Sequence, residues 1–138
     1  MKDSLVITIP SHPKFLSVAR AVTNRIGQLY DIAEDTIEEI KLAVDEACAN
    51  VIKHAYKGDT SKKIILKYRV TGDAFKVIIE DNGSKVSKRH VKGRDLDDIR
   101  PGGLGVHFIK KVFDIFEFDE RKGKGNRLTL VRHMKIKT

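Results

Sequence analysis

The order in which the hydrophobic period changes along the chain constrains the fold more than any other feature. Runs typical of strands occur at 5–9, 64–70, 75–80, 115–118 and 127–132. Helical periodicity occurs in two consecutive segments after the first strand, and once more after residue 101. Because strands and helices do not alternate regularly, we expect an α+β fold. It should be a two-layer α/β sandwich, with a mixed, mostly antiparallel sheet covered on one face by three helices.

Length and composition indicate one domain that spans residues 1–138. The chain has 138 residues, of which 41% are hydrophobic, so it can bury one sizeable core. Cys48 is the single cysteine, which excludes an internal disulfide framework. The N-terminal apolar run ends at Pro10 and is too short for a signal peptide or a membrane span. We therefore expect a cytoplasmic protein without a membrane partner.

The formal net charge of +8 is compatible with a nucleic acid, an acidic protein or a phosphate ligand. The chain has no Trp and no recognisable nucleic-acid reader motif. Direct binding of nucleic acid is therefore the weakest of these alternatives.

Capping residues and apolar stripes define the first two helices. Ser11 is expected to cap the first helix, and Asp35 with Glu38 should form a capping box for the second. The expected apolar stripe of the first helix is Phe15, Val18, Val22, Ile26 and Leu29. The expected stripe of the second helix is Ile37, Ile40, Val44, Ala47, Val51 and Ala55, and Gly58 should end it.

Glu46 and Asn50 lie four residues apart on the second helix, and therefore on one face of it. Lys53 and His54 continue that face one turn later. A carboxylate and a carboxamide so placed can hold hydrated magnesium, and Glu46 could accept a proton from a hydroxyl. Taken alone, the pair fits a solvated helix face better.

Asp81-Asn82-Gly83 ends the strand at 75–80. An aspartate there can accept a hydrogen bond from an exocyclic amino group such as that of adenine, and Gly83 allows a flat base to approach the backbone. Taken alone, the segment fits an ordinary turn better.

Gly102-Gly103-Leu104-Gly105 opens the third helix, whose N-terminal N–H groups could bind phosphate. A flexible loop that precedes a helix is an equally good interpretation. The segment is neither a Walker A loop nor a dinucleotide fingerprint, because the remaining residues of both motifs are missing. Residues 84–101, charged and weakly periodic, are long enough to form a functional lid.

Taken in order, these segments resemble the histidine-kinase-like ATPase superfamily, which has the Bergerat fold. The segment 39–56 (EIKLAVDEACANVIKHAY) is similar, more closely, to the anti-sigma factor serine kinases of bacterial partner-switching systems. The resemblance covers nearly the whole chain. Its most specific part is the helix that carries Glu46 and Asn50, and the glycine segment is the next most specific.

The resemblance implies a role for each matched residue. Glu46 would be the general base, Asn50 the magnesium ligand, and Asp81 the adenine-binding residue with Gly83 beneath the base. Residues 84–101 would be the ATP lid. The other residues expected to contact ATP are Lys53, His54, Gly102, Gly103, Leu104 and Gly105.

The resemblance also implies cofactors and partners. These are ATP and Mg²⁺, a small anti-sigma-factor antagonist phosphorylated on serine or threonine, a sigma factor that is sequestered, and a second copy in a homodimer. The alternative is a nucleotide-gated regulator without kinase activity, because three features depart from the family. The lid is short, and two positions differ. Lys85 stands where many relatives have a second glycine, and Arg127 stands where a threonine often supports the base site.

Overall fold

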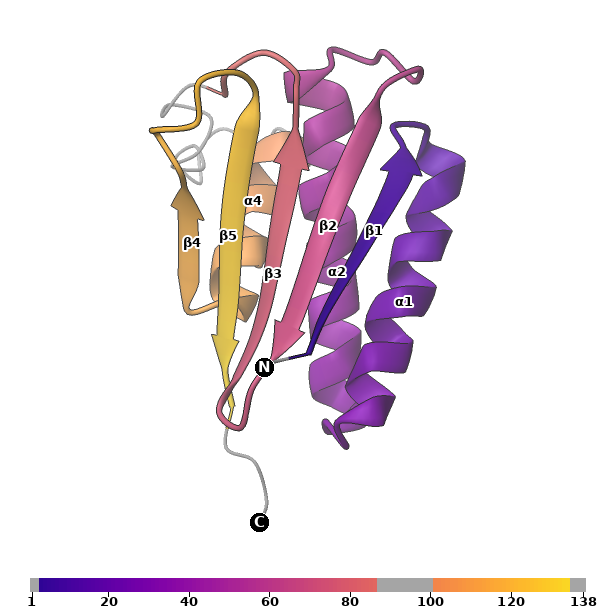
Figure 1. Cartoon of the computed structure of the whole chain (residues 1–138), viewed down its shortest axis with the longest axis vertical. Helices are drawn as coiled ribbons and strands as arrows, with labels where there is room; N and C mark the ends of the chain where they lie inside the picture. Colours follow the sequence, from indigo (N-terminus) through magenta and orange to yellow (C-terminus); the bar gives the residue numbers. More distant parts are fainter. Residues whose placement is uncertain (1–2, 87–100, 135–138) are drawn as a thin grey trace.

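The computed structural model describes residues 3–86 and 101–134, with the backbone alone for residues 101–104. Three α-helices cover one face of a five-stranded sheet, which confirms the predicted α+β sandwich (Figure 1). The strands are β1 (Ser4–Pro10), β2 (Lys63–Val70), β3 (Ala74–Asp81), β4 (Ile115–Phe118) and β5 (Asn126–His133). The helices are η1 (Pro13–Phe15), α1 (Leu16–Leu29), α2 (Glu34–Asn50), the π-helical η2 (Val51–Ala55) and α4 (Pro101–Val112).

The strand order in the sheet is β1-β2-β3-β5-β4. Each of the four neighbouring pairs is antiparallel, so the expected mixed character is wrong for the strands that the structure describes. The reason is that β2–β3 and β4–β5 are hairpins and β5 returns beside β3. The register between β3 and β5 pairs Asp81 with Asn126 and Glu80 with Arg127. Side chains alternate along a strand, so these two pairs project to opposite faces.

The core lies between the helices and the inner face of the sheet. All six residues of the stripe predicted for α2 are buried in it. Cys48 is also fully buried, and burial raises the pKa of its thiol to about 12. Among the largest buried side chains are Tyr68, Phe75, Ile64, Leu66, Ile79 and Leu130.

The apolar stripe predicted for α1 is partly wrong. In α1 the buried residues include Leu16, Ala19 and Thr23, whereas Val18 and Leu29 are 44% and 62% exposed. The buried face of α1 also includes Gly27. Because neither Thr23 nor Gly27 is a large apolar residue, a stripe chosen from large apolar residues lies to one side of this face.

Ser11 and Asp35 do not cap these helices. Ser11 is buried, donates to the Asp59 carbonyl at 2.7 Å and accepts from Lys62 N at 3.0 Å, so it ties β1 to the segment before β2. The N-cap of α2 is Ala33, without a side-chain hydrogen bond, and Asp35 lies inside the first turn. The N-cap of α2 therefore lies two residues before the predicted one, an error that is usual for helix boundaries.

Glu80 lies on the outer face of the sheet, yet its side chain is only 8% exposed. Its carboxylate pairs with Lys67 at 2.5 Å, with Arg127 at 3.0 Å and with Lys122 at 3.8 Å. Burial acts to raise the pKa of Glu80, but the hydrogen bonds from Lys67 and Arg127 outweigh it and lower the pKa below its usual 4.5.

We expect Glu80→Gln to lower the free energy of unfolding at pH 7 by about 1–3 kcal/mol, because three cations lose their common anion. Because the folded-state pKa is depressed, this contribution is present above pH 4.5 and is lost as the pH falls through the folded-state value. Urea unfolding of both proteins across this range measures the difference. The difference in unfolding free energy between the two proteins should become smaller at low pH. As a control, replacement of the exposed Glu117 by Gln should have little effect. A difference that does not change with pH would contradict this account.

Candidate functional site

Glu46 points at the first turn of α4. A Cβ atom placed on Gly105 would overlap the Oε2 atom of Glu46, so a side chain at this position would displace the carboxylate. The rest of the glycine segment, residues 102–104, is already helical, because α4 begins at Pro101. The segment therefore lies at the start of the helix, as the sequence predicts, and not in a flexible loop before it. The carboxylate from α2 and the N-terminus of α4 therefore face each other.

Asn50 is the last residue of α2 and is half-buried, one turn after Glu46. The helix then continues as η2, in which Tyr56 N donates to the Val51 carbonyl at 2.9 Å, five residues back. Lys53 in η2 is exposed and His54 is half-buried. A π-helical turn inside a helix often marks a functional site, and it changes the direction of the following side chains. Spacing in the sequence does not reveal such a turn.

Asp81 is 3% exposed at the end of β3. Its Oδ1 atom accepts hydrogen bonds from Gly83 N at 2.8 Å and from Asn126 Nδ2 at 3.0 Å. Its Oδ2 atom has a longer contact of 3.3 Å with the same Nδ2 atom. Burial raises the pKa of Asp81, and these hydrogen bonds oppose the shift. The structure thus holds the carboxylate in one orientation and leaves Oδ2 less fully bonded.

Asn126, which was not predicted as a site residue, supports Asp81. It also donates from Nδ2 to the Ser84 carbonyl at 2.9 Å and accepts from Val86 N at 3.0 Å. The preceding Gly125 has φ +76°, and a Cβ there would overlap the Asp81 carbonyl.

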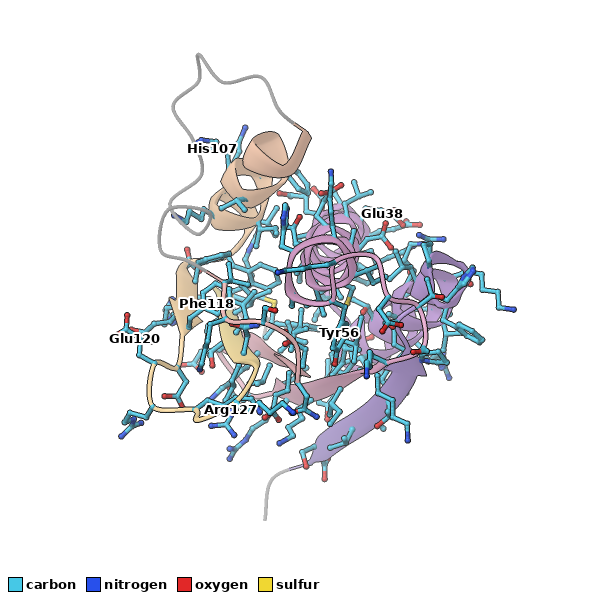
Figure 2. All side chains as sticks on the ribbon, turned by 90° about the horizontal axis from the view of Figure 1, so that it is seen from above. Glu38, Tyr56, His107, Phe118, Glu120 and Arg127 are labelled. Carbon is cyan, nitrogen blue, oxygen red and sulfur yellow. The ribbon has the colours of Figure 1, made fainter. Side chains whose placement is uncertain are left out.

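The expectation that Arg127 lies at the base site is wrong. It donates to Glu80 at 3.0 Å and to Asp119 at 2.9 Å, on the side of the sheet away from the helices (Figure 2). The alternation of β5 is the reason, since successive side chains point to opposite faces. The sequence did hold a sign of this arrangement. Glu80 and Arg127 have opposite charges, and they directly neighbour Asp81 and Asn126 in the sequence.

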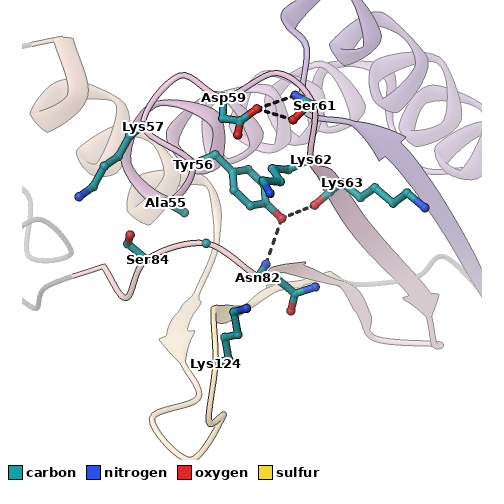
Figure 3. Close-up of a pocket in the computed structure, with 11 residues that line it drawn as sticks. Ala55, Tyr56, Lys57, Asp59, Ser61, Lys62, Lys63, Asn82, Ser84 and Lys124 are labelled. Carbon is teal, nitrogen blue, oxygen red and sulfur yellow. Dashed lines mark hydrogen bonds between the residues drawn. The ribbon is translucent and has the colours of Figure 1, made fainter.

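The loop after Asp81 is attached to η2, the π-helical continuation of α2. Ser84 N donates to the Ala55 carbonyl at 2.8 Å, and a Cβ at Gly83 would overlap the same carbonyl oxygen. The Tyr56 hydroxyl accepts from Asn82 N at 3.0 Å and donates to the Lys63 carbonyl at 2.5 Å (Figure 3). Tyr56 thus joins η2, the start of β2 and the loop after β3.

Little of the predicted lid falls within the described part of the chain. Residues 87–100 of the expected segment 84–101 lie outside it. Lys85, which replaces a glycine of many relatives, donates from Nζ to the Lys122 carbonyl in the β4–β5 connection. Lys85 therefore points toward this connection and makes a contact that glycine could not make.

Comparison with known proteins identifies the family. Residues 9–132 match the family described as the histidine kinase-like ATPase domain. The chain belongs to the histidine kinase-like ATPase family. Membership implies ATP binding.

Within that family, the chain is similar to the serine-protein kinases named RsbW. It is 30% identical to RsbW of Listeria innocua serovar 6a over 122 residues, which cover 83% of this chain and 78% of the relative. It is 25% identical to RsbW of Bacillus subtilis over 129 residues, which cover 88% and 81%. These matches support membership in the group of anti-sigma factor serine kinases.

Solved structures support the fold. The structure of the RsbU and RsbW domains of Rv1364c from Mycobacterium tuberculosis matches with a TM-score of 0.68 at 17% identity. The match covers 99% of this chain and 35% of that longer chain. The mycobacterial sensor histidine kinase MprB matches with a TM-score of 0.57 at 12% identity, over 99% of this chain and all of that one. No helix in the described residues is both long and apolar enough to cross a membrane.

Proposed function

We propose that the chain is an ATP-dependent protein-serine/threonine kinase that acts as an anti-sigma factor. The observation that carries this proposal is the direction of Glu46, whose carboxylate meets the glycine-rich first turn of α4. That turn is where a terminal phosphate would be held, because free N–H groups and the positive end of the helix dipole favour anions. A base beside the phosphate is the arrangement that phosphoryl transfer to a hydroxyl requires.

In this proposal Asp81 and Gly83 bind the adenine. The less fully bonded Oδ2 atom of Asp81 can accept a hydrogen bond from the exocyclic amine, while Asn126 and Gly83 N hold Oδ1. The missing side chain at Gly83 lets the loop pack directly against the Ala55 carbonyl, which holds the backbone beside Asp81 in place. Gly102, Gly103, Leu104 and Gly105 supply N–H groups for the phosphates, and Lys53 and His54 lie next to the triphosphate.

Asn50 is the residue that would hold Mg²⁺. Its carboxamide oxygen is a hard ligand one helical turn from the Glu46 carboxylate, and this donor set suits a magnesium ion that keeps most of its waters. When bound, the ion neutralises phosphate charge during transfer.

The chemical step assigns one role to Glu46. Its carboxylate takes the proton of the substrate serine or threonine hydroxyl as the oxygen forms a bond to the γ-phosphorus. The bond from that phosphorus to the bridging oxygen breaks, and ADP leaves with the electron pair. The proton remains on Glu46 until it passes to solvent.

The proposed substrate is a small anti-sigma-factor antagonist, and the second proposed partner is a sigma factor held by the unmodified protein. The names of the relatives support the kinase part, because they are serine-protein kinases. A homodimer is the proposed assembly, and 1–138 the proposed domain.

A transfer assay tests the function. Incubation with γ-labelled ATP, Mg²⁺ and a candidate antagonist encoded beside this chain should place label on a serine or threonine of that partner. Omission of Mg²⁺ should remove the signal, because the ion is part of the proposed site. Saturable ATP binding without any labelled partner would instead support a nucleotide-gated regulator that lacks kinase activity.

A further inference from the structure

A second cavity lies near the proposed ATP site but does not include its main residues. It has a volume of about 640 Å³ and lies between the turn after η2, the start of β2, the loop after β3 and the β4–β5 connection (Figure 3). Gly83, which is proposed to lie beneath the adenine, lines this cavity, whereas Glu46, Asn50 and Asp81 do not. Its size falls in the range of small-molecule pockets, about 300–1,000 Å³.

Four lysines line the cavity and come from three separate segments of the chain. They are Lys57, Lys62, Lys63 and Lys124. Within the described residues, none of the four forms an ion pair with a carboxylate. The Lys57 and Lys63 side chains extend in opposite directions, while Lys62 and Lys124 lie between them on either side of Tyr56 and Asn82 (Figure 3). The positive charges around the cavity favour an anion there.

Asp59 is the one carboxylate among the lining residues, and the adjacent turn already uses it. Its Oδ1 atom accepts from Ser61 Oγ at 2.6 Å and from Ser61 N at 2.9 Å. These two hydrogen bonds lower the pKa of Asp59, so it stays ionised at neutral pH. One carboxylate leaves the cavity with a clear excess of positive charge.

The remaining lining groups suit an anion with several oxygen atoms. Asn82 and Ser84 are exposed and add neutral donors, and the buried Ala55 and Tyr56 give the cavity an apolar part. Lysine binds phosphate as a mobile point charge, and Lys62 together with Lys124 suits a group that carries two or more negative charges.

From this arrangement we propose that the cavity binds a small molecule that carries a phosphate or pyrophosphate group, at a site that adjoins the proposed ATP site at Gly83 but does not include Glu46, Asn50 or Asp81. The proposal does not depend on kinase activity. The phosphate could belong to a free phosphorylated metabolite or to a phosphorylated side chain, and the choice of probe separates these sources.

The test is a titration with inorganic pyrophosphate, monitored by amide chemical shifts of the full chain without Mg²⁺. We expect saturable shifts at Lys57, Ser61, Lys62 and Lys124, and the same shifts after saturation with a non-hydrolysable ATP analogue. In the Lys62→Gln/Lys124→Gln variant the affinity should fall about tenfold or more, since two charged contacts are lost. O-phosphoserine in a parallel titration shows whether a phosphorylated side chain binds as well as the free anion.

A matched control separates a site from general attraction to a basic protein. Lys14→Gln/Lys76→Gln removes the same charge at positions outside the cavity and should leave the affinity unchanged. The proposal is overturned if both variants lose affinity equally, if the shifts occur at Asp81 and Gly105 instead, or if the ATP analogue abolishes them. Tighter binding of a tetraglutamate peptide than of pyrophosphate would also overturn it.

Discussion

Replacement of Glu46 by Gln is expected to remove most phosphoryl transfer and leave ATP binding nearly unchanged. The amide has the shape of the carboxylate and still fits against Gly105, but it cannot take a proton from the substrate hydroxyl. The loss of a general base typically costs about 10²–10⁴-fold in rate. Single-turnover transfer from labelled ATP to the antagonist measures the rate, and calorimetry measures the affinity for ATP.

Glu34→Gln is the matched control for this experiment. Glu34 lies in the exposed first turn of the same helix, far along it from Glu46, and its replacement makes the same chemical change. We expect it to transfer phosphate at the unaltered rate. Full transfer by Glu46→Gln would remove the residue from the role of base, and loss of both transfer and ATP binding would point to a structural role instead.

Asp81→Asn should weaken ATP binding by about 10–150-fold, because hydrogen bonds to charged groups contribute about 1.5–3 kcal/mol. The Asn carbonyl can still accept from Gly83 N and Asn126, so the loop should keep its conformation. The NH₂ group then replaces Oδ2 and presents a donor to the donor of adenine. Calorimetry with ATP, together with thermal unfolding as a check on folding, measures the effect.

Asp73→Asn serves as the control for that measurement. Asp73 is exposed in the β2–β3 turn and accepts a hydrogen bond from Thr71 at 3.0 Å. It should bind ATP as the unaltered protein does. Equal affinities of Asp81→Asn and Asp73→Asn for ATP would contradict the assignment of Asp81 to the base.

The long second helix and the sheet could be predicted from the sequence because their patterns are local and strong. The stripe from Ile37 to Ala55 repeats over five turns, and all of it is buried. The α1 stripe was partly wrong because the buried face of this helix includes Thr23 and Gly27, which an apolar pattern does not count. The cap predicted at Ser11 was wrong because the Ser11 hydroxyl forms hydrogen bonds with Asp59 and Lys62, which lie far along the chain. Local spacing in the sequence does not show such long-range contacts.

At the candidate site, the sequence pattern predicted roles for Glu46, Asp81 and the glycine segment. It also predicted Arg127 beside the base site, whereas the structure has Asn126 beside Asp81. A strand changes side-chain face at each residue, so an error of one position exchanges the inner for the outer face. Asn126 and Arg127 differ by such a step. The π-helical turn after Asn50 was not predicted either, because the apolar pattern of the sequence does not distinguish it from an α-helix.

The attachment of Tyr56 and Ala55 to the segment after Asp81 has a consequence for communication within the molecule. The same short stretch of chain follows Asn50, accepts a hydrogen bond from Ser84 N and borders the lysine-lined cavity. These three parts are therefore joined by direct contacts. If a ligand in the lysine-lined cavity changes the affinity for ATP, then by thermodynamic linkage ATP changes the affinity for that ligand by the same factor.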